Sequence, residues 1–326
     1  MHKKTMTILA TCVVATGITA GSAVAQTAYP AKPVRIIVPW PAGGGTDMLA
    51  RPVAQRLAER LGQAVLIDNR GGASGIVGSE VAAKAPADGY NVMIDNITSH
   101  ATNMTLYPKL NYNSLRDYAP VTLLSTASNI IVVHPSLPVK SLKELIALAK
   151  SRPGQLNFAS YGTGGTTHLA GEMLKAQAGI NMVHIPYKGG APATADALAG
   201  HVPVYFSVLV TSQQQIKAGK LRALAVTSAQ RDAVFPEVPT VAESGFPGFE
   251  ANNWYGMLTP AGVPREVIAK LNAETHAVMK MPDVVERLSA MGNTIVVSTP
   301  EKMREHMIGE TEKWAKVIKT AGVRPE

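Results

Sequence analysis

The fold is decided by one stretch near the N-terminus, Val34-Arg35-Ile36-Ile37-Val38-Pro39-Trp40-Pro41-Ala42-Gly43-Gly44-Gly45-Thr46-Asp47. Its first five residues are mostly β-branched and predict a buried strand, and the prolines and glycines that follow predict a tight turn. Thr46 or Asp47 is expected to cap a helix, which Gly62 ends. Apolar residues recur at helical spacing in between, so the stretch predicts a strand, a glycine-rich turn and an amphipathic helix.

The same pattern recurs along the chain. Residues 65–67 and 90–95 are two further strands, separated by the turn Asn69–Gly75 and a helix. A second series begins at Asn157–Ser160 and continues with the turn Tyr161–His168 and a helix. Further strands are expected at 183–187, 202–209 and 223–227. This alternation predicts an α/β fold with a largely parallel sheet, built as two similar halves.

Two extended segments, 120–133 and 249–256, are the expected crossings between the halves. Two amphipathic helices, about 265–280 and 300–320, follow the second crossing. Met303, Met307, Trp314 and Val317 are expected to pack the last helix inward.

The N-terminus has the pattern of a secretory signal. Met1-His2-Lys3-Lys4 is positively charged, residues 7–20 are mostly apolar, and Ala23-Val24-Ala25 fits the small-x-small cleavage rule. We expect residues 1–25 to be removed and the mature chain to begin at Gln26 in the periplasm; an uncleaved membrane anchor is the alternative. The single cysteine, Cys12, lies in the removed segment. The mature chain is therefore expected to have no disulfide, thiolate metal site or cysteine nucleophile.

The charge of the chain is modest. The sequence has 31 Lys and Arg residues and 23 Asp and Glu residues, and the signal carries two lysines and no acid, which leaves a mature net charge of +6. A small positive charge attracts anionic ligands. No run of lysine and arginine interleaved with aromatic residues is present, so we expect no nucleic-acid partner.

Two glycine-rich turns, 43–47 and 162–168, each join a strand to a helix, one in each half. Free backbone N–H groups and the helix dipole favour an anion at a helix N-terminus, and glycine lets the backbone approach it closely. Threonines at 46, 163, 166 and 167 add hydroxyl donors. Two such turns across a cleft would each hold one end of a carboxylate ligand, although ordinary tight turns have the same sequence. Asp47 and Asp95 remain open as either turn anchors or ligand contacts.

Nucleotide and enzyme functions fit the sequence poorly. The turn 43–47 lacks the lysine of a P-loop, and His168 stands where a dinucleotide-binding turn needs its last glycine or alanine. The sequence has no Gly-x-Ser-x-Gly motif and no His-Glu-x-x-His motif. We therefore expect no catalytic residues, no cofactor and no metal, and His168 is expected to be a hydrogen-bonded residue at a helix start.

The chain as a whole resembles the Bug-type, TctC-like receptors of tripartite tricarboxylate transporters. The matching segments extend over nearly the full mature length; they include Tyr29-Pro30, Pro33–Pro39, Pro41–Asp47, Asn69–Gly75, Pro86–Tyr90, Val183–Gly189, Ala218–Thr227, Val238–Val241, Trp254–Gly256 and Pro260–Gly262.

The resemblance implies a type II periplasmic binding-protein fold of the Venus-flytrap kind. Domain 1 would be discontinuous, 26–124 and 252–326, and domain 2 would span 125–251. The expected function is capture of a small carboxylate between the domains and its delivery to the membrane permease subunits of the transporter, with the receptor acting as a monomer. The ligand-binding positions carried over from the family are Trp40, Ala42, Gly43, Gly44, Thr46, Asp47, Ser160, Gly162, Gly164, Thr166, Tyr187, Lys188 and Gly189. Ser207 is added to them as an expected ligand-binding residue.

One position departs from the family pattern. After Val204-Tyr205-Phe206 the family commonly has an Asp-Asn pair, and this chain has Ser207-Val208. Loss of the acid removes a partner for an ammonium group, which favours a plain mono- or dicarboxylate over an amino acid. Two other functions stay open: a secreted hydrolase that uses His168, and a receptor that reports to a membrane sensor.

Overall fold

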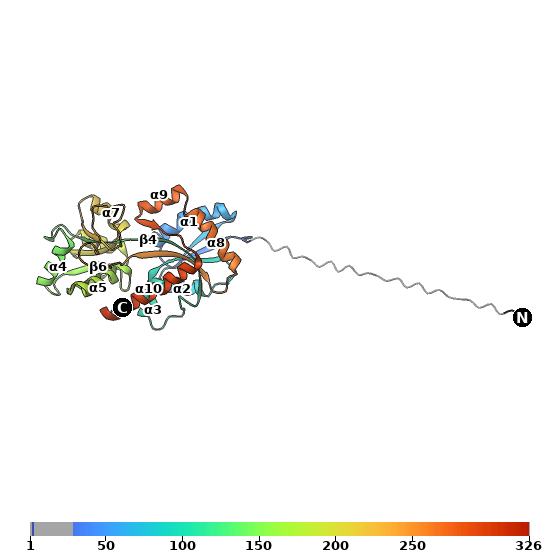
Figure 1. The fold of residues 1–326 in the computed structure, drawn as a ribbon, viewed down its shortest axis with the longest axis horizontal. Coiled ribbons are helices and arrows are strands. Elements are labelled where there is room, and N and C mark those ends of the chain that lie inside the picture. Colours follow the sequence, from blue (N-terminus) through green and yellow to red (C-terminus); the bar gives the residue numbers. More distant parts are fainter. Residues whose placement is uncertain (1, 3–28, 326) are drawn as a thin grey trace.

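The computed structural model describes residue 2 and residues 29–325. The expected cleavage site at Ala25, and all but one residue of the expected signal, lie outside the described residues. Figure 1 shows two α/β halves side by side, with β4 (Tyr118–Ala127) passing between them. The α/β fold in two halves is thus as the sequence predicts.

The first half contains a six-stranded sheet in the order β11-β4-β10-β3-β1-β2. Its strands are β1 (Val34–Val38), β2 (Val65–Asn69), β3 (Asn91–Asn96), β4, β10 (Asn253–Pro260) and β11 (Asn293–Ile295). Its helices and turns are α1 (Gly45–Leu61), η1 (Ala73–Gly75), α2 (Ile76–Ala83), η2 (Thr98–Thr102), α3 (Asn103–Leu106), α8 (Arg265–Val278), α9 (Pro282–Ala290) and α10 (Pro300–Ala321).

The second half contains a five-stranded sheet in the order β7-β6-β8-β5-β9. Its strands are β5 (Asn129–Val133), β6 (Asn157–Ser160), β7 (Val183–Pro186), β8 (Val204–Val208) and β9 (Arg222–Val226). Its helices are α4 (Leu142–Ser151), α5 (Thr166–Ala178), α6 (Gly190–Leu198) and α7 (Leu209–Lys217). The strands of the first sheet thus come partly before and partly after those of the second sheet in the sequence. The exact domain boundaries, 124/125 and 251/252, stay a prediction.

The expectation of a largely parallel sheet is wrong for both halves. Strand β1 runs parallel to β2 and β3, but β10 runs antiparallel to both β3 and β4, and β11 antiparallel to β4. In the second half β6 is parallel to β7 and β8, whereas β5 is antiparallel to β8 and β9. The antiparallel pairs involve the strands by which the chain crosses between the halves, whereas the parallel pairs belong to the strand–helix–strand repeats.

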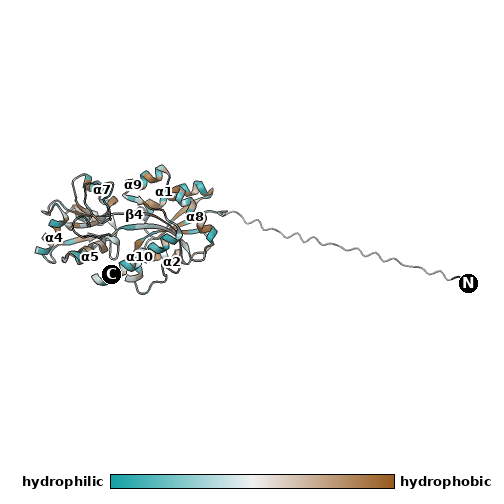
Figure 2. Cartoon of the chain, in the orientation of Figure 1, coloured by the Kyte–Doolittle hydropathy of each residue, from teal (hydrophilic) through white to brown (hydrophobic). Residues whose placement is uncertain are grey.

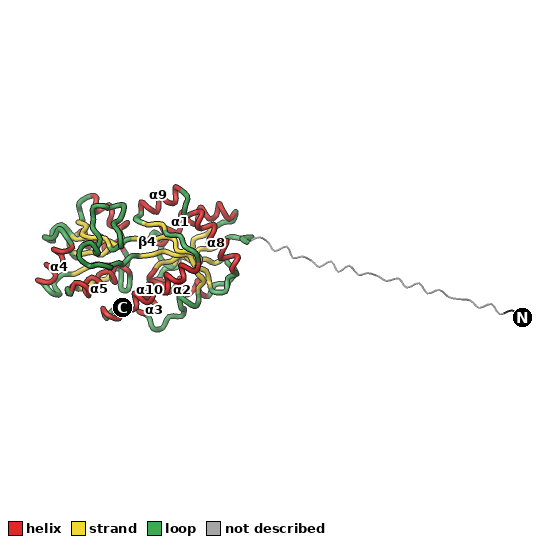
Figure 3. The backbone as a smooth tube through the Cα atoms, viewed as in Figure 1, coloured by secondary structure: helices red, strands yellow, loops and turns green. Residues whose placement is uncertain are grey.

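Helices cover the sheets, and their apolar sides face inward. Figure 3 shows the strands in the middle of each half with helices around them, and Figure 2 shows that the helices are largely hydrophilic on their outer sides. Helices α3, α4, α7 and α9 were not predicted from the sequence. The last of these begins at Pro282, a favoured residue in the first helical turn.

Helix α10 connects the two halves. It packs against η2 and β4 of the first half and against α5 of the second. Met303, Met307 and Trp314 are buried as expected, but Val317 is only partly buried and Ile318 takes the inward position after Trp314. One apolar core continues through this helix from Met93 in the first sheet to Phe158 in the second.

The helices differ in how their N-termini are satisfied. The hydroxyl of Ser141 accepts the N–H of Glu144 in α4 at 3.2 Å, and the hydroxyl of Thr299 accepts the N–H of Lys302 in α10. Helices α1 and α5 instead have Gly44 and Gly165 at the N-cap, with no side-chain cap. The predicted cap at Thr46 or Asp47 is therefore wrong, because the N-cap is Gly44, two residues before Thr46 and three before Asp47.

Candidate ligand-binding site

The first glycine-rich turn leaves the first backbone N–H groups of α1 without hydrogen-bond acceptors. Gly43 has a φ of +80°, which favours glycine, and Gly44 follows with φ −75° and ψ 167°. The N–H of Gly44 donates to the carbonyl of Pro41 at 3.2 Å. Among the described residues, no acceptor is found for the N–H groups of residues 45–47, the first three of the helix. These groups are available to a ligand.

Asp47 holds this turn together. It is 1% exposed, and its carboxylate accepts from the N–H of Gly43 at 2.8 Å, from Arg51 Nε at 2.8 Å and from Asn69 Nδ2 at 3.0 Å. Burial alone would raise the pKa of Asp47, but the hydrogen bonds from Arg51, Gly43 and Asn69 hold it below the usual value. Its lone pairs are thus directed at the protein, which makes Asp47 a turn anchor.

Trp40 lies beside the turn and is fixed by Asp95. The indole Nε1 donates to Asp95 Oδ1 at 2.7 Å, and Asp95 is fully buried at the end of β3. Burial raises the pKa of Asp95 to about 7. The other carboxyl oxygen is 3.5 Å from His100 Nε2, and burial lowers the pKa of that imidazole to about 3. Asp95 is therefore an anchor for Trp40 beneath the site.

The second turn repeats the arrangement of the first. Gly164 has a φ of +78°, and Gly165 follows with φ −69° and ψ 159° at the N-cap of α5. The N–H of Gly165 donates to the carbonyl of Gly162 at 3.3 Å, and the N–H of Gly164 donates to His168 Nδ1 at 3.0 Å. Thr166 is buried in the first turn of the helix. His168 is hydrogen-bonded at the helix start, as the sequence analysis expected.

The segment Tyr187-Lys188-Gly189 lies against this turn. The N–H of Tyr187 donates to the carbonyl of Ser160, and the N–H of Gly189 donates to the carbonyl of Tyr161, both at 3.1 Å. Gly189 is the N-cap of α6 and, like Gly165, supplies no side-chain cap. The hydroxyl of Tyr187 is engaged with Asp196 at 2.6 Å, whereas Lys188 is exposed. The structure thus places two uncapped helix N-termini, those of α5 and α6, next to each other.

Ser207 sits inside a cluster of hydroxyl groups. It is fully buried at the end of β8, 2.8 Å from Thr211 Oγ1 and 2.7 Å from Ser212 Oγ. The hydroxyl of Tyr161 lies 3.3 Å from Ser207 Oγ and accepts the N–H of Val208, the N-cap residue of α7. The polar groups at this position are therefore satisfied by neutral hydroxyls, without an acid.

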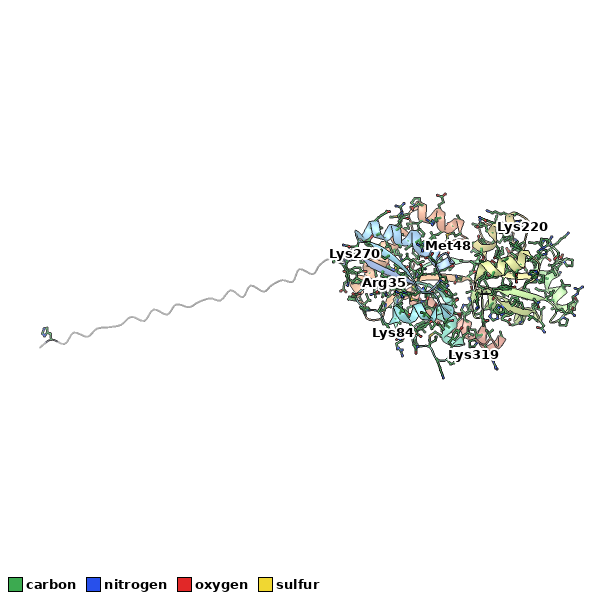
Figure 4. All side chains as sticks on the ribbon, turned by 180° about the vertical axis from the view of Figure 1, so that it is seen from behind. Arg35, Met48, Lys84, Lys220, Lys270 and Lys319 are labelled. Atoms are coloured by element: carbon green, nitrogen blue, oxygen red, sulfur yellow. The ribbon has the colours of Figure 1, made fainter. Side chains whose placement is uncertain are left out.

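The predicted residues form two groups, one in each half. Hydrogen bonds join residues within the first group, 40–47, and within positions 160–189 of the second group, to which Ser207 is linked through Tyr161. No hydrogen bond joins one group to the other among the fourteen predicted positions. The halves do meet beside the second turn, where a Cβ on Gly164 would lie 2.1 Å from Leu106 Cδ1 of α3. Figure 4 shows Met48, in the first turn of α1, on the side of the first half that borders the second.

Sequence reasoning missed several residues that shape the site. Arg51 pairs with Asp47, Asn69 bridges Asp47 and the carbonyl of Trp40, and Tyr161 reaches the Ser207 cluster. His184 stacks on His168 with ring centroids 3.6 Å apart and lies 2.6 Å from Ser160 Oγ. The Asp47–Arg51 pair could have been predicted from its i,i+4 spacing. The contacts of Tyr161 and His184 join residues far apart in the sequence, so no local pattern predicts them.

The described residues contain no cluster of three or more His, Cys, Asp or Glu side chains suited to a metal ion. No helix in this part of the chain combines the length and the apolar character that a membrane span requires.

Comparison with known proteins gives a consistent answer. Residues 49–323 match the family described as "Tripartite tricarboxylate transporter family receptor". A solved R. palustris protein with adipate is 38% identical, with a TM-score of 0.85 over 91% of this chain and 100% of that one. The periplasmic binding protein BugD is 34% identical, with a TM-score of 0.81 over 91% and 100% of the two chains. A Rhodopseudomonas palustris protein with bound malate is 29% identical, with a TM-score of 0.80 over 89% and 100%.

These likenesses confirm the two-domain fold of periplasmic binding-protein type. The family match covers most of the sequence, and the solved relatives are covered over their full length. The chain belongs to the family of tripartite tricarboxylate transporter receptors, the Bug-type periplasmic solute-binding proteins.

Proposed function

We propose that this protein is an exported receptor that captures a small carboxylate between its two halves and delivers it to the permease of a tripartite tricarboxylate transporter. The observation that carries the proposal is the pair of glycine N-caps, Gly44 and Gly165, each at a helix whose first N–H groups lack a side-chain cap. Such N-termini stabilise carboxylate oxygens by hydrogen bonds and by the helix dipole. Relatives solved with adipate and with malate support the same ligand class.

The ligand we propose is a mono- or dicarboxylate without an essential ammonium group. Ser207, with Tyr161 and Thr211, supplies only neutral hydroxyls where the family commonly has an acid. A buried ammonium without an anionic partner carries a large desolvation cost. Amino acids are therefore expected to bind more weakly than the corresponding plain acids.

A thermal-shift screen of the mature protein tests this function. A ligand at about 100 times its dissociation constant adds roughly 2.7 kcal/mol of apparent stability, which raises Tm by roughly 5–10 °C. We expect mono- and dicarboxylates, adipate and malate among those tested, to give the largest shifts, and aspartate and glutamate to give small ones. Shifts confined to sugars or cations would exclude the proposed ligand class.

The hydrolase alternative gains no support from the site. His168 would be the base, but its Nδ1 accepts the N–H of Gly164, and its Nε2 lies 3.7 Å from Glu172. Ser160, which contacts His184, is fully buried. The receptor is expected to return its ligand unchanged, so chromatography of adipate and malate after prolonged incubation with the protein should show no product. A sensing role uses the same capture step, and deletion of the transporter genes distinguishes it, because only transport requires them.

Export is the remaining part of the proposal. The charged start, the apolar segment 7–20 and Ala23-Val24-Ala25 support cleavage after Ala25. N-terminal sequencing of protein from the periplasmic fraction should begin at Gln26 or within a few residues of it. Recovery of a chain that still contains Cys12 would show that the signal is retained.

A further inference from the structure

The two glycine turns are the same local structure made from different sequences. Gly43 and Gly164 have φ angles of +80° and +78°. In each turn the next residue is a glycine N-cap whose N–H donates to the carbonyl three residues before it. The N–H of each left-handed glycine donates to a side chain four residues later, Asp47 in one half and His168 in the other.

In each turn the side chain that accepts the glycine N–H has a partner of its own one helical turn later, but the two pairs differ in charge. Asp47 bonds Arg51, four residues further along α1, at 2.8 Å. His168 has Glu172, four residues further along α5, at 3.7 Å. The acceptor for the glycine N–H is thus an anion backed by a cation in the first half and a neutral ring nitrogen backed by an anion in the second. The geometry is kept although both side-chain types differ.

We propose that Asp47 and His168 are equivalent positioning residues, each fixing its turn by accepting the N–H of the glycine four residues before it. The inference rests on the proposed function, because the fixed turns are the ones that present free N–H groups to the carboxylate. Glycine adopts positive and negative φ with similar ease, so an unsupported glycine turn samples several shapes. One hydrogen bond from the left-handed glycine to a fixed side chain selects a single shape before the ligand arrives, which lowers the entropy lost on binding.

The surroundings of His168 fix its orientation. Accepting at Nδ1 requires the ring proton on Nε2, and that nitrogen faces Glu172. Lys175 also bonds Glu172, at 2.8 Å. On the other side the ring stacks on His184 of β7 and lies near Phe158 of β6. The ring is thus held from two sides, so the acceptor nitrogen is directed at Gly164.

The test separates positioning from general stability. His168→Asn keeps an acceptor oxygen at the place of Nδ1, and His168→Ala removes the acceptor. Asp47→Asn and Asp47→Ala give the same comparison in the first turn. In ligand-free protein we expect His168→Ala to speed amide hydrogen exchange at Gly164 by about 10-fold or more, and Asp47→Ala to do so at Gly43. The Asn variants should recover most of this protection, while Ser141→Ala, which removes a cap in α4, should leave both amides unchanged.

Adipate binding by titration calorimetry gives the second measurement. Each Ala variant should bind about 10-fold or more weakly than wild type, and each Asn variant should recover most of that loss. Unchanged exchange at Gly43 and Gly164 in folded Ala variants would overturn the inference whatever the affinities are, and so would Asn variants as impaired as Ala. If wild type binds neither adipate nor malate, the proposed ligand class fails, while the exchange data still decide the role of the two residues.

Discussion

Gly44→Asp and Gly165→Asp are each expected to reduce carboxylate affinity by about 100-fold or more with little change in the stability of the protein. Both residues already have the extended backbone of an N-cap, which suits aspartate. The new carboxylate would accept the free N–H groups of its own helix and would repel a ligand carboxylate from the same place. An aspartate cap is better than glycine by a few tenths of a kcal/mol, while a Cβ at position 44 would lie 3.2 Å from the carbonyl of Pro41 and require a small local shift. These opposing effects should leave the free energy of unfolding within about 1 kcal/mol of wild type.

Matched variants show whether the negative charge is the cause. Gly44→Ala and Gly165→Ala add the Cβ, which meets the carbonyl of Pro41 at 3.2 Å or that of Gly162 at 3.4 Å, but they bring no acceptor. These variants should retain binding within roughly a factor of ten, because the N–H groups stay free. Ser141→Ala should lose about 1 kcal/mol of stability and bind normally. Aspartate variants that are folded and bind adipate like wild type would place the carboxylate elsewhere.

Asp95→Asn is expected to stabilise the protein more and more, relative to wild type, as the pH rises from about 4 to about 7. In the unfolded chain this carboxyl ionises near its ordinary pKa of 3.8, whereas in the folded protein burial raises the pKa to about 7. Over this interval the folded state holds a proton that the unfolded state has lost, so rising pH favours unfolding of wild type. The difference corresponds to a stability gain on the order of 4 kcal/mol for the variant at pH 8 relative to low pH.

His100 makes the comparison with wild type necessary. Burial lowers its pKa to about 3, so the folded protein keeps it neutral while the unfolded chain protonates it, which destabilises the fold as the pH falls. Wild type and Asp95→Asn both contain His100, so the difference between their free energies of unfolding reports the titration of Asp95. Urea unfolding at pH 5 and pH 8 measures it, with exposed Asp283→Asn as the control. A stability difference between Asp95→Asn and wild type that does not change with pH would refute the account of this buried group.

Much of the fold and the location of the site could be predicted from local sequence patterns. The strand at 34–38, the glycine turn and the end of α1 at Gly62 follow from β-branching, glycine and helical spacing, which act between near neighbours. The antiparallel pairing of β10 with β3 and β4 depends on contacts between residues far apart in the sequence, and no local pattern reports it.

The chemistry of the site could be predicted only in part from the sequence. The sequence placed Gly43 and Gly164 at the site, but the structure shows that their N–H groups are satisfied by Asp47 and His168. That leaves the N–H groups of the following helical residues for the ligand. The distinction depends on which side chain folds back onto the turn, and a tight turn and a binding turn have the same composition.

Mass spectrometry of the ligand released from protein freshly purified from the periplasm tests directly whether the protein carries a small carboxylate. We expect a mono- or dicarboxylate without an ammonium group, bound to wild type and absent from Gly44→Asp and Gly165→Asp purified in the same way. A sugar, an amino acid or a cation released from wild type, or the same carboxylate retained by both aspartate variants, would contradict it.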